Sequence, residues 1–196
     1  AVKNSLRAAL ASRFPQAVLL TGPAGSGKMT LSKVIAAALL CTGEGEKPCG
    51  VCPSCRKMEH EVHPDLDILD EGEADLPVAL ARDLRSRVSV LPNEGDRRVA
   101  IIRHAHKLNV QAQNALLKVL EEPPQYAFFV LTSERPGEIL ETIRSRCTRY
   151  QLAPPHEPQV TDEELLGLLT PFLRALADGN EYQMLLAAMK LEKQPK

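Results

Sequence analysis

Ala17-Val-Leu-Leu-Thr-Gly-Pro-Ala-Gly-Ser-Gly-Lys28 is the stretch of this 196-residue chain that decides its fold. Its first five residues are mostly apolar and predict a buried strand over Ala17–Thr21. Its last seven fit the phosphate-binding pattern G-x-x-x-x-G-K, and an apolar helical pattern over Lys28–Leu40 follows at once. Because phosphate loops work between a strand and a helix, the context supports the match. The sequence therefore predicts an α/β nucleotide-binding domain.

The loop carries most of the groups that hold a nucleotide. Glycines let the backbone turn its N–H groups toward the phosphates, and Lys28 would neutralise the β- and γ-phosphates of ATP or ADP. The next position usually supplies a hydroxyl for Mg²⁺ but holds Met29, and the neighbouring Thr30 is rotated by roughly 100° along the helix. Binding without strong Mg-dependent hydrolysis is expected, and a glycine-rich turn that binds nothing is the alternative. The expected contact residues are Gly22, Gly25, Gly27, Lys28, Met29 and Thr30.

Short apolar runs alternate with longer helical patterns along most of the chain. The expected strands are Ala17–Thr21, Leu66–Asp70, Val99–Ile102, Phe128–Thr132 and Arg149–Leu152. The expected helices are Ser5–Ser12, Lys28–Leu40, Leu76–Val90, Asn109–Glu122 and Gly137–Ile143. Strands separated by helices predict a parallel sheet with helices on both faces.

A proline-rich segment, Ala153–Pro158, ends this alternation and is typical of a linker. Beyond it, Thr161 and Glu164 form a capping box ahead of an apolar helical pattern, and a second helix is expected after Asp178. We therefore expect a nucleotide-binding domain over 1–153 and a small all-α unit over 154–196. The chain begins without Met inside an expected helix and stops in another, so we expect a fragment of a longer protein.

Composition narrows the functional classes. With 24 Lys and Arg against 25 Asp and Glu, the formal net charge is −1, so any contact with DNA must be local. The longest apolar run, Val34–Cys41, is far shorter than a membrane span, and no secretion signal opens the chain. No membrane partner is expected, and the cytoplasm is the expected location.

Four of the five cysteines lie close together in the sequence and are separated by turn-forming Gly and Pro. Thiolates at such spacing converge tetrahedrally on Zn²⁺, and four sulfur ligands leave no position for a reactive water. A structural zinc module at 41–55 is therefore expected, with an iron–sulfur cluster or free cysteines as alternatives. The ligands would be Cys41, Cys49, Cys52 and Cys55, and the nearby His60 and His63 are expected to be solvated.

A hydrolysing enzyme also needs carboxylates for Mg²⁺ and water, and two segments compete for this role. The first ends in Asp70-Glu71, but its alternating apolar and acidic residues suit a half-exposed strand. The second, Val99–Ile102, is apolar throughout, as a central parallel strand should be, and ends in Arg103-His104. If this second strand lies beside the phosphate loop, a guanidinium replaces the metal ligand and hydrolysis is crippled.

Several motifs together carry a family resemblance over about Val2–Pro155. They are the phosphate loop, the four-cysteine insertion, His63-Pro-Asp-Leu66, Val99-Ala-Ile-Ile102, Gln113-Asn-Ala-Leu-Leu-Lys-Val-Leu-Glu-Glu-Pro-Pro124 and Ile143-Arg-Ser-Arg-Cys147. The set resembles the AAA+ clamp-loader subunits of bacterial DNA polymerase III, most closely the delta-prime branch. The resemblance implies an AAA+ domain with a zinc-binding insertion, an all-α lid that is truncated here, and a collar domain absent from this chain.

The resemblance also implies a function. A delta-prime subunit joins gamma/tau and delta subunits in a hetero-oligomeric ring that loads the sliding clamp onto primed DNA during replication. Arg103 and His104, where a motor subunit would show Asp-Glu, favour this branch, which would lack ATPase activity of its own within the polymerase holoenzyme. The alternative is an ATP-hydrolysing gamma/tau-type motor that uses Asp70 and Glu71. A nucleotide kinase has no reason to carry the Ser-Arg-Cys and Glu-Glu-Pro-Pro segments.

Two further residues gain expected roles from the resemblance. Arg146 in Ser145-Arg-Cys147 matches the arginine that reaches the ATP of a neighbouring subunit and stabilises the transferring phosphoryl group. A surface arginine paired with a carboxylate is the alternative. Thr132 matches a polar position that senses the γ-phosphate, and a satisfied hydroxyl at a strand end is equally compatible with the sequence.

Overall fold

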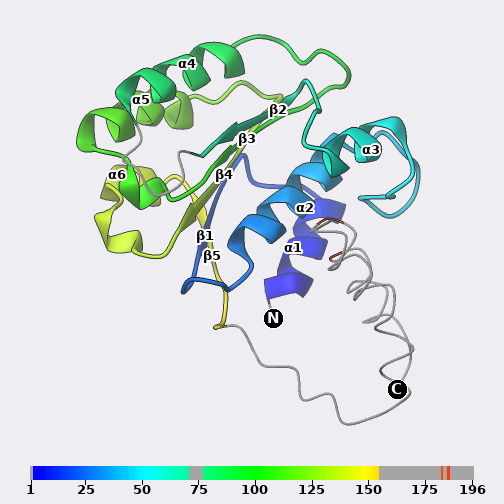
Figure 1. Cartoon of the computed structure of the whole chain (residues 1–196), viewed down its shortest axis with the longest axis horizontal. Helices are drawn as coiled ribbons and strands as arrows, with labels where there is room; N and C mark the ends of the chain where they lie inside the picture. The colour runs from blue at the N-terminus through cyan, green and yellow to red at the C-terminus, as the bar shows by residue number, and fades with distance from the viewer. Residues whose placement is uncertain (1, 71–76, 155–181, 183–184, 186–196) are drawn as a thin grey trace.

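The computed structural model describes residues 2–70 and 77–154 together with Tyr182 and Leu185. Its centre is a five-stranded parallel sheet in the order β2-β3-β4-β1-β5 (Figure 1). The strands are β1 Ala17–Thr21, β2 Leu66–Leu69, β3 Arg98–Ile102, β4 Ala127–Ser133 and β5 Thr148–Gln151. The expected parallel sheet is confirmed, and each expected strand is found to within one residue at either end.

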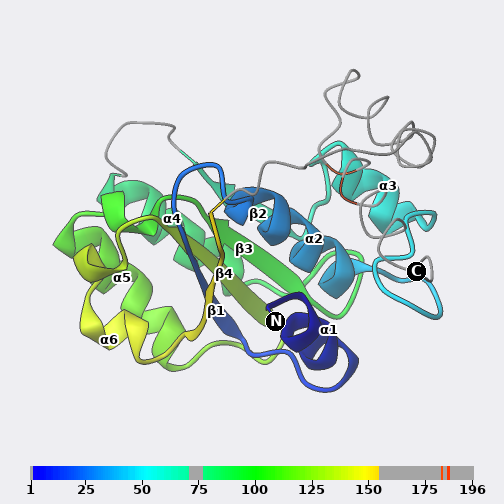
Figure 2. The same ribbon diagram turned by 90° about the horizontal axis from the view of Figure 1, so that it is seen from below.

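Helices cover both faces of the sheet. One face carries α1 Val2–Ala11, α2 Lys28–Leu40 and α3 Pro53–Glu59. The other face carries α4 Val78–Val88, α5 Val110–Glu121 and α6 Glu141–Arg144. Figure 2 shows the sheet between these two layers. Two short 3-10 helices, Ala105–Lys107 and Pro136–Glu138, complete the described elements.

Successive side chains along each strand point to opposite faces of the sheet, so the strands contribute to two separate cores. On β1, Leu19 faces α4 and α5, whereas Val18 and Leu20 face α2, and all three are fully buried. On β4, Phe129 joins the first core and Val130 the second. A strand buried on both faces needs apolar side chains at every position, which explains the unbroken apolar runs in the sequence.

The helix expected over Gly137–Ile143 is divided into a 3-10 turn and α6. The buried side chain of Gln113 explains the break. Its Oε1 accepts a hydrogen bond from the Leu140 N–H at 2.7 Å, and its Nε2 donates to the carbonyls of Leu108 and Glu138. One amide side chain thus satisfies backbone groups that a continuous helix would have paired internally.

The edge strand β2 differs at one position from its expected half-exposed character. Asp67 is buried, and its carboxylate lies 2.9 Å from Arg87 and 3.4 Å from Arg98. Asp65, just before the strand, is completely buried and accepts hydrogen bonds from the N–H groups of Asn93 and Glu94. Leu66, Ile68 and Asp70 keep partial or full exposure, so the expectation is wrong only for Asp67. Asp67 and Asp65 belong to a buried charge network, because arginines and backbone amides compensate them.

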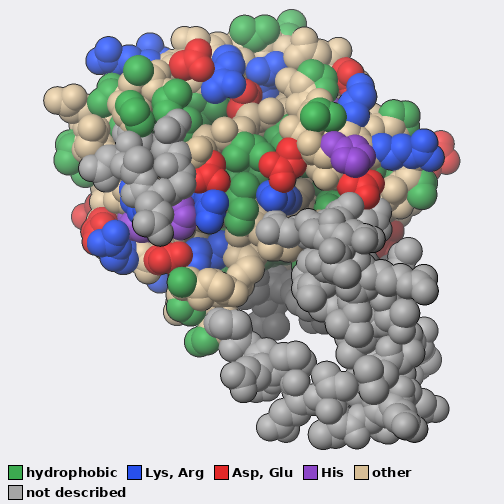
Figure 3. Space-filling view, in the orientation of Figure 1, with side chains coloured by type: hydrophobic (Ala, Val, Ile, Leu, Met, Phe, Trp, Pro, Cys, Tyr) green, Lys and Arg blue, Asp and Glu red, His purple; other side chains and the backbone are tan. Residues whose placement is uncertain are grey.

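The all-α unit expected over 154–196 lies outside the described residues except at two positions. Of these, Tyr182 is buried with the core side chains of α1 and α2. Within the described part of the chain, no helix is both long and apolar enough to cross a lipid bilayer. Figure 3 shows acidic and basic side chains intermixed over one face of the molecule, as the near-zero net charge leads us to expect.

The buried network predicts a pH-dependent stability. Burial raises the pKa of Asp65, but the amide hydrogen bonds outweigh it and hold the pKa below its ordinary value of 3.8. The resulting stabilisation of the folded state is fully present above pH 3.8 and is lost as the pH falls through the lowered pKa. Asp65→Asn should therefore reduce the free energy of unfolding at neutral pH by about 1.5 to 3 kcal/mol, with a difference that shrinks in acid.

Urea unfolding of both proteins, from neutral to acidic pH, measures this difference in the free energy of unfolding. Asp83→Asn is the matched control, because Asp83 is exposed and an exposed ion pair contributes little. Equal stability of Asp65→Asn and the unmodified protein at neutral pH would contradict the assignment.

Candidate functional site

The phosphate loop joins the carboxyl end of β1 to the first residue of α2. Gly25 and Gly27 have φ values of 71° and 77°, in the left-handed region that favours glycine, and Gly27 caps the helix. At Gly22, a β-carbon would lie 2.9 Å from the carbonyl oxygen of Leu152. The glycines are therefore required by the loop's shape and its close contact with the end of β5.

Lys28 lies folded over the loop. Its side chain is buried, and its Nζ donates to the carbonyl oxygens of Gly22 at 3.0 Å and Pro23 at 2.6 Å. Among the described residues, the carboxylate of Glu134 faces this ammonium, with its Oε1 3.6 Å from Nζ. A phosphate that binds Lys28 must replace the carbonyl contacts and accept Glu134 as a neighbour.

The strand order corrects one expectation about this site. β1 pairs with β4 and β5, so β4 separates it from β3, and Arg103 does not lie beside the phosphate loop. Instead, Nη1 of Arg103 forms a 2.7 Å ion pair with Asp70, at the end of the edge strand. Glu134 was not predicted from the sequence. The feature that could have indicated it is its place directly after β4, one of the two strands that pair with β1.

The other residues expected at the nucleotide have distinct surroundings. Met29 packs against the apolar core around α1 and α2, so it offers no ligand to a cation. Thr30 is half-buried. Thr132 is buried, and its hydroxyl oxygen accepts the backbone N–H of His104 at 3.1 Å, so the hydroxyl is used within the protein.

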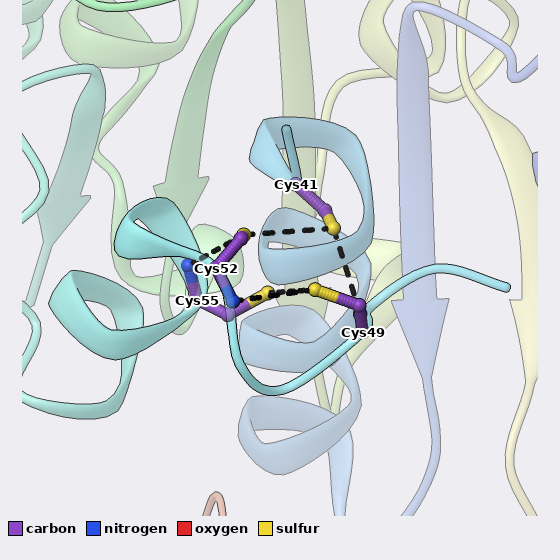
Figure 4. Close-up of side chains that lie close together, drawn as sticks. All are labelled: Cys41, Cys49, Cys52 and Cys55. Carbon is purple, nitrogen blue, oxygen red and sulfur yellow. Dashed lines mark hydrogen bonds between the residues drawn. The ribbon is translucent and has the colours of Figure 1, made fainter. Parts of the chain in front are cut away.

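The four clustered cysteines converge at the end of α2. Their sulfur atoms all lie within 4.8 Å of one another and point toward a common centre (Figure 4). The pairs Cys41–Cys52 and Cys49–Cys55 are each separated by 3.9 Å, far longer than a disulfide. Sulfurs around a tetrahedral ion at about 2.3 Å lie roughly 3.8 Å apart, so the donor set and spacing fit a closed four-sulfur metal site.

Local structure positions the cysteine sulfurs and changes their pKa values. Cys52 caps α3, and its sulfur accepts the N–H of Cys55, although no helix was expected in this segment. Burial opposes ionisation of Cys52, but hydrogen bonds from Cys55 and Thr42 outweigh it and lower its pKa to about 5. Burial raises the pKa of Cys55 to about 12. A bound cation would therefore be needed to hold all four sulfurs as thiolates.

The two nearby histidines behave differently. His60 ends α3 and is exposed, as expected. His63 was expected to be solvated but is buried, and its Nδ1 accepts the N–H of Asp65 at 3.1 Å. The expectation failed because His63 belongs to the turn that leads into β2, where its ring nitrogen is used as an acceptor within the turn.

Arg146 lies at the opposite end of the sheet from the phosphate loop. It precedes β5, whose first residue Thr148 is level with Val18 near the start of β1. Its side chain is 36% exposed, and its guanidinium contacts Glu121 at 2.9 Å and the carbonyl of Thr142 at 2.7 Å. The arginine therefore lies at the domain edge, remote from its own loop, and is paired with a carboxylate within this chain.

Comparison with known proteins gives a family match over most of the chain. Residues 1–156 match the family model described as DNA polymerase III, delta subunit. A DNA polymerase III subunit delta' of Pseudomonas aeruginosa is 38% identical, over 80% of this chain and 53% of its own length. A DNA polymerase III subunit gamma/tau of Mycobacterium tuberculosis is 36% identical, over 74% of this chain and 26% of its own length. The chain thus spans about half of the first relative and about a quarter of the second.

Solved structures support the fold. A DNA polymerase III gamma subunit-related protein of Thermotoga maritima superposes with a TM-score of 0.56 at 22% identity, over 96% of this chain and 57% of that protein. The parallel sheet between two helical layers, with a phosphate loop after β1, is therefore an AAA+ fold.

The tight packing of the cysteine cluster predicts that Gly43 is essential to it. A β-carbon at Gly43 would lie 2.6 Å from the Cys49 sulfur, closer than real contacts allow. Gly43→Ala should therefore lower the metal content below one ion per chain, measured by elemental analysis of the purified protein. Gly95→Ala is the matched control, because a β-carbon there meets nothing within 4 Å. Full metal content in Gly43→Ala would contradict the site.

Proposed function

The chain belongs to the DNA polymerase III, delta subunit family, and from this premise we propose that it is part of a delta-prime clamp-loader subunit with little or no ATPase activity of its own. The residue after Lys28 carries the proposal. It is Met29, which packs against the apolar core and has no hydroxyl for the Mg²⁺ that phosphoryl transfer requires. Arg103 follows β3 where the resemblance to motor subunits would place Asp-Glu, so no carboxylate stands at that strand end, which lies one strand away from the loop.

Nucleotide binding without efficient turnover is part of this proposal. The loop amides, the start of α2 and Lys28 can hold the phosphates of ATP or ADP. Binding would exchange the contacts of Lys28 with the carbonyls of Gly22 and Pro23 for contacts with phosphate oxygens. The phosphate loop would then serve in assembly or conformational control.

Zinc is the metal we propose for the cysteine cluster. Four sulfurs without an open coordination position favour a structural ion, although an iron–sulfur cluster uses the same donors. When bound, zinc supplies cross-linking between the end of α2 and the start of α3. The protein's own contribution is to place Cys41 at the end of one helix and Cys52 at the start of the other.

The proposed partners are gamma/tau and delta subunits in a ring that loads the sliding clamp onto primed DNA. Arg146 supports a role toward a neighbour, because it lies at the edge of the domain far from its own phosphate loop. Its planar fork suits the oxygens of a γ-phosphate. In this role the guanidinium would leave Glu121 and bind the nucleotide of the adjacent subunit.

A gamma/tau-type motor is the second candidate, and the 36% identity to the Mycobacterium tuberculosis subunit favours it. It would need Asp70 and Glu71 as catalytic carboxylates. Asp70 lies at the edge strand and is paired with Arg103, whereas Glu71 lies outside the described residues. The two candidates differ in the ATPase rate of the subunit itself.

That rate is the first test. The full-length subunit that contains this chain should hydrolyse ATP at no more than about a tenth of the rate of a motor subunit, since Met29 supplies no hydroxyl for Mg²⁺. Steady-state phosphate release measures this, with Lys28→Ala as the background. A rate equal to that of a motor subunit, abolished in Lys28→Ala, would favour the motor alternative.

The second test concerns Arg146. Arg146→Ala should slow ATP hydrolysis and clamp loading by the reconstituted ring by about tenfold or more, because a trans-acting arginine stabilises charge on the transferring phosphoryl group. The fold and metal content should stay unchanged. Arg135→Ala is the matched control, because Arg135 is also exposed and also paired with a glutamate, at 2.8 Å. Unmodified rates with Arg146→Ala would leave Arg146 as an ion-pair partner of Glu121 alone.

A further inference from the structure

We propose that Glu134 sets the nucleotide specificity of the phosphate loop, so that the loop takes a nucleoside diphosphate in preference to a triphosphate. This inference rests on the proposed nucleotide site and adds its substrate class. Glu134 belongs to no motif quoted from the sequence, and the strand order alone brings it to the loop.

The backbone fixes Glu134 in this place. β4 pairs with β1 in the register Thr21 to Ser133, and the N–H of Gly22 donates to the carbonyl oxygen of Ser133 at 3.3 Å. Glu134 is the next residue, so it lies level with the start of the loop. Its position follows from the sheet itself and not from a long flexible segment.

The carboxylate of Glu134 competes for the same cation as a nucleotide. Its Oε1 lies 3.6 Å from Nζ of Lys28, and the Glu134 side chain is 34% exposed. The lysine of a phosphate loop reaches the β- and γ-phosphates, so a γ-phosphate bound to Lys28 would come within a few Å of this carboxylate. Like charges at that separation repel strongly where water is partly excluded. A diphosphate avoids most of this repulsion because it has no third phosphate.

Three described arginines near this edge of the sheet have other partners. Arg149 donates through Nε to the hydroxyl of Thr21 at 3.3 Å. Arg135 is directed to Glu138 at 2.8 Å, and Arg103 to Asp70 at 2.7 Å. Burial lowers the pKa of His104, so its imidazole is neutral near pH 7. The missing hydroxyl at Met29 also weakens any Mg²⁺ that would shield the γ-phosphate. A triphosphate therefore meets Glu134 without an equivalent counter-charge.

Binding of ADP and ATP to the full-length subunit, with and without Mg²⁺, tests the proposal by titration calorimetry. The unmodified protein should bind ADP about tenfold more tightly than ATP, a difference typical of one added like charge nearby. Glu134→Gln keeps the size of the side chain and removes its charge. It should tighten ATP binding about tenfold and change ADP binding less than about threefold.

Glu141→Gln is the matched control, because Glu141 is an exposed glutamate at the start of α6 rather than at the phosphate loop. It should change neither affinity, and Lys28→Ala should abolish both. Equal affinities for ADP and ATP in the unmodified protein would overturn the proposal. So would weaker Mg·ATP binding by Glu134→Gln, which would make Glu134 a metal ligand, or the absence of binding by both proteins. Absence of binding would also remove nucleotide binding from the proposed function. All of these outcomes leave the proposed role in clamp loading intact, because its test measures hydrolysis and loading by the assembled ring.

Discussion

The parallel pairing of β1 with β4 is the constraint on which the rest of the structure depends. It places Ser133 against the first glycine of the phosphate loop and brings Glu134 to Lys28. It also moves β3, with Arg103 at its end, one strand away from the loop. Because parallel strands share one carboxyl edge, the same pairing separates that edge, where a nucleotide would bind, from the opposite edge that carries Arg146.

Helix α2 joins the two chemical centres of the domain. It begins at Lys28 and ends before Cys41, so the phosphate loop and the cysteine cluster occupy its two ends, about 20 Å apart. Nearly every residue in its second half is buried. A buried helix of this kind is held by the second core. The cluster therefore anchors one end of the element whose other end would contact phosphate.

Local patterns predicted the strands and α2 closely, because each needs only the period of its own side chains. Nonlocal features escaped prediction for physical reasons. The strand order that removes Arg103 from the loop depends on pairing across the whole sheet. The burial of Asp67 depends on Arg87 and Arg98, which are distant in sequence, and the break at Leu140 depends on Gln113. The convergence of the four cysteines could be predicted from their spacing, whereas the neighbour of Lys28 could not.

In the proposed ring, this domain acts through Arg146 on a nucleotide that the adjacent subunit holds. A structure of the assembled ring with an ATP analogue tests this most directly, through the position of the Arg146 guanidinium. We predict that it leaves Glu121, which it contacts at 2.9 Å in this chain, and lies within hydrogen-bond distance of the γ-phosphate in the adjacent subunit. An Arg146 that stays paired with Glu121 in the nucleotide-bound ring would contradict the account.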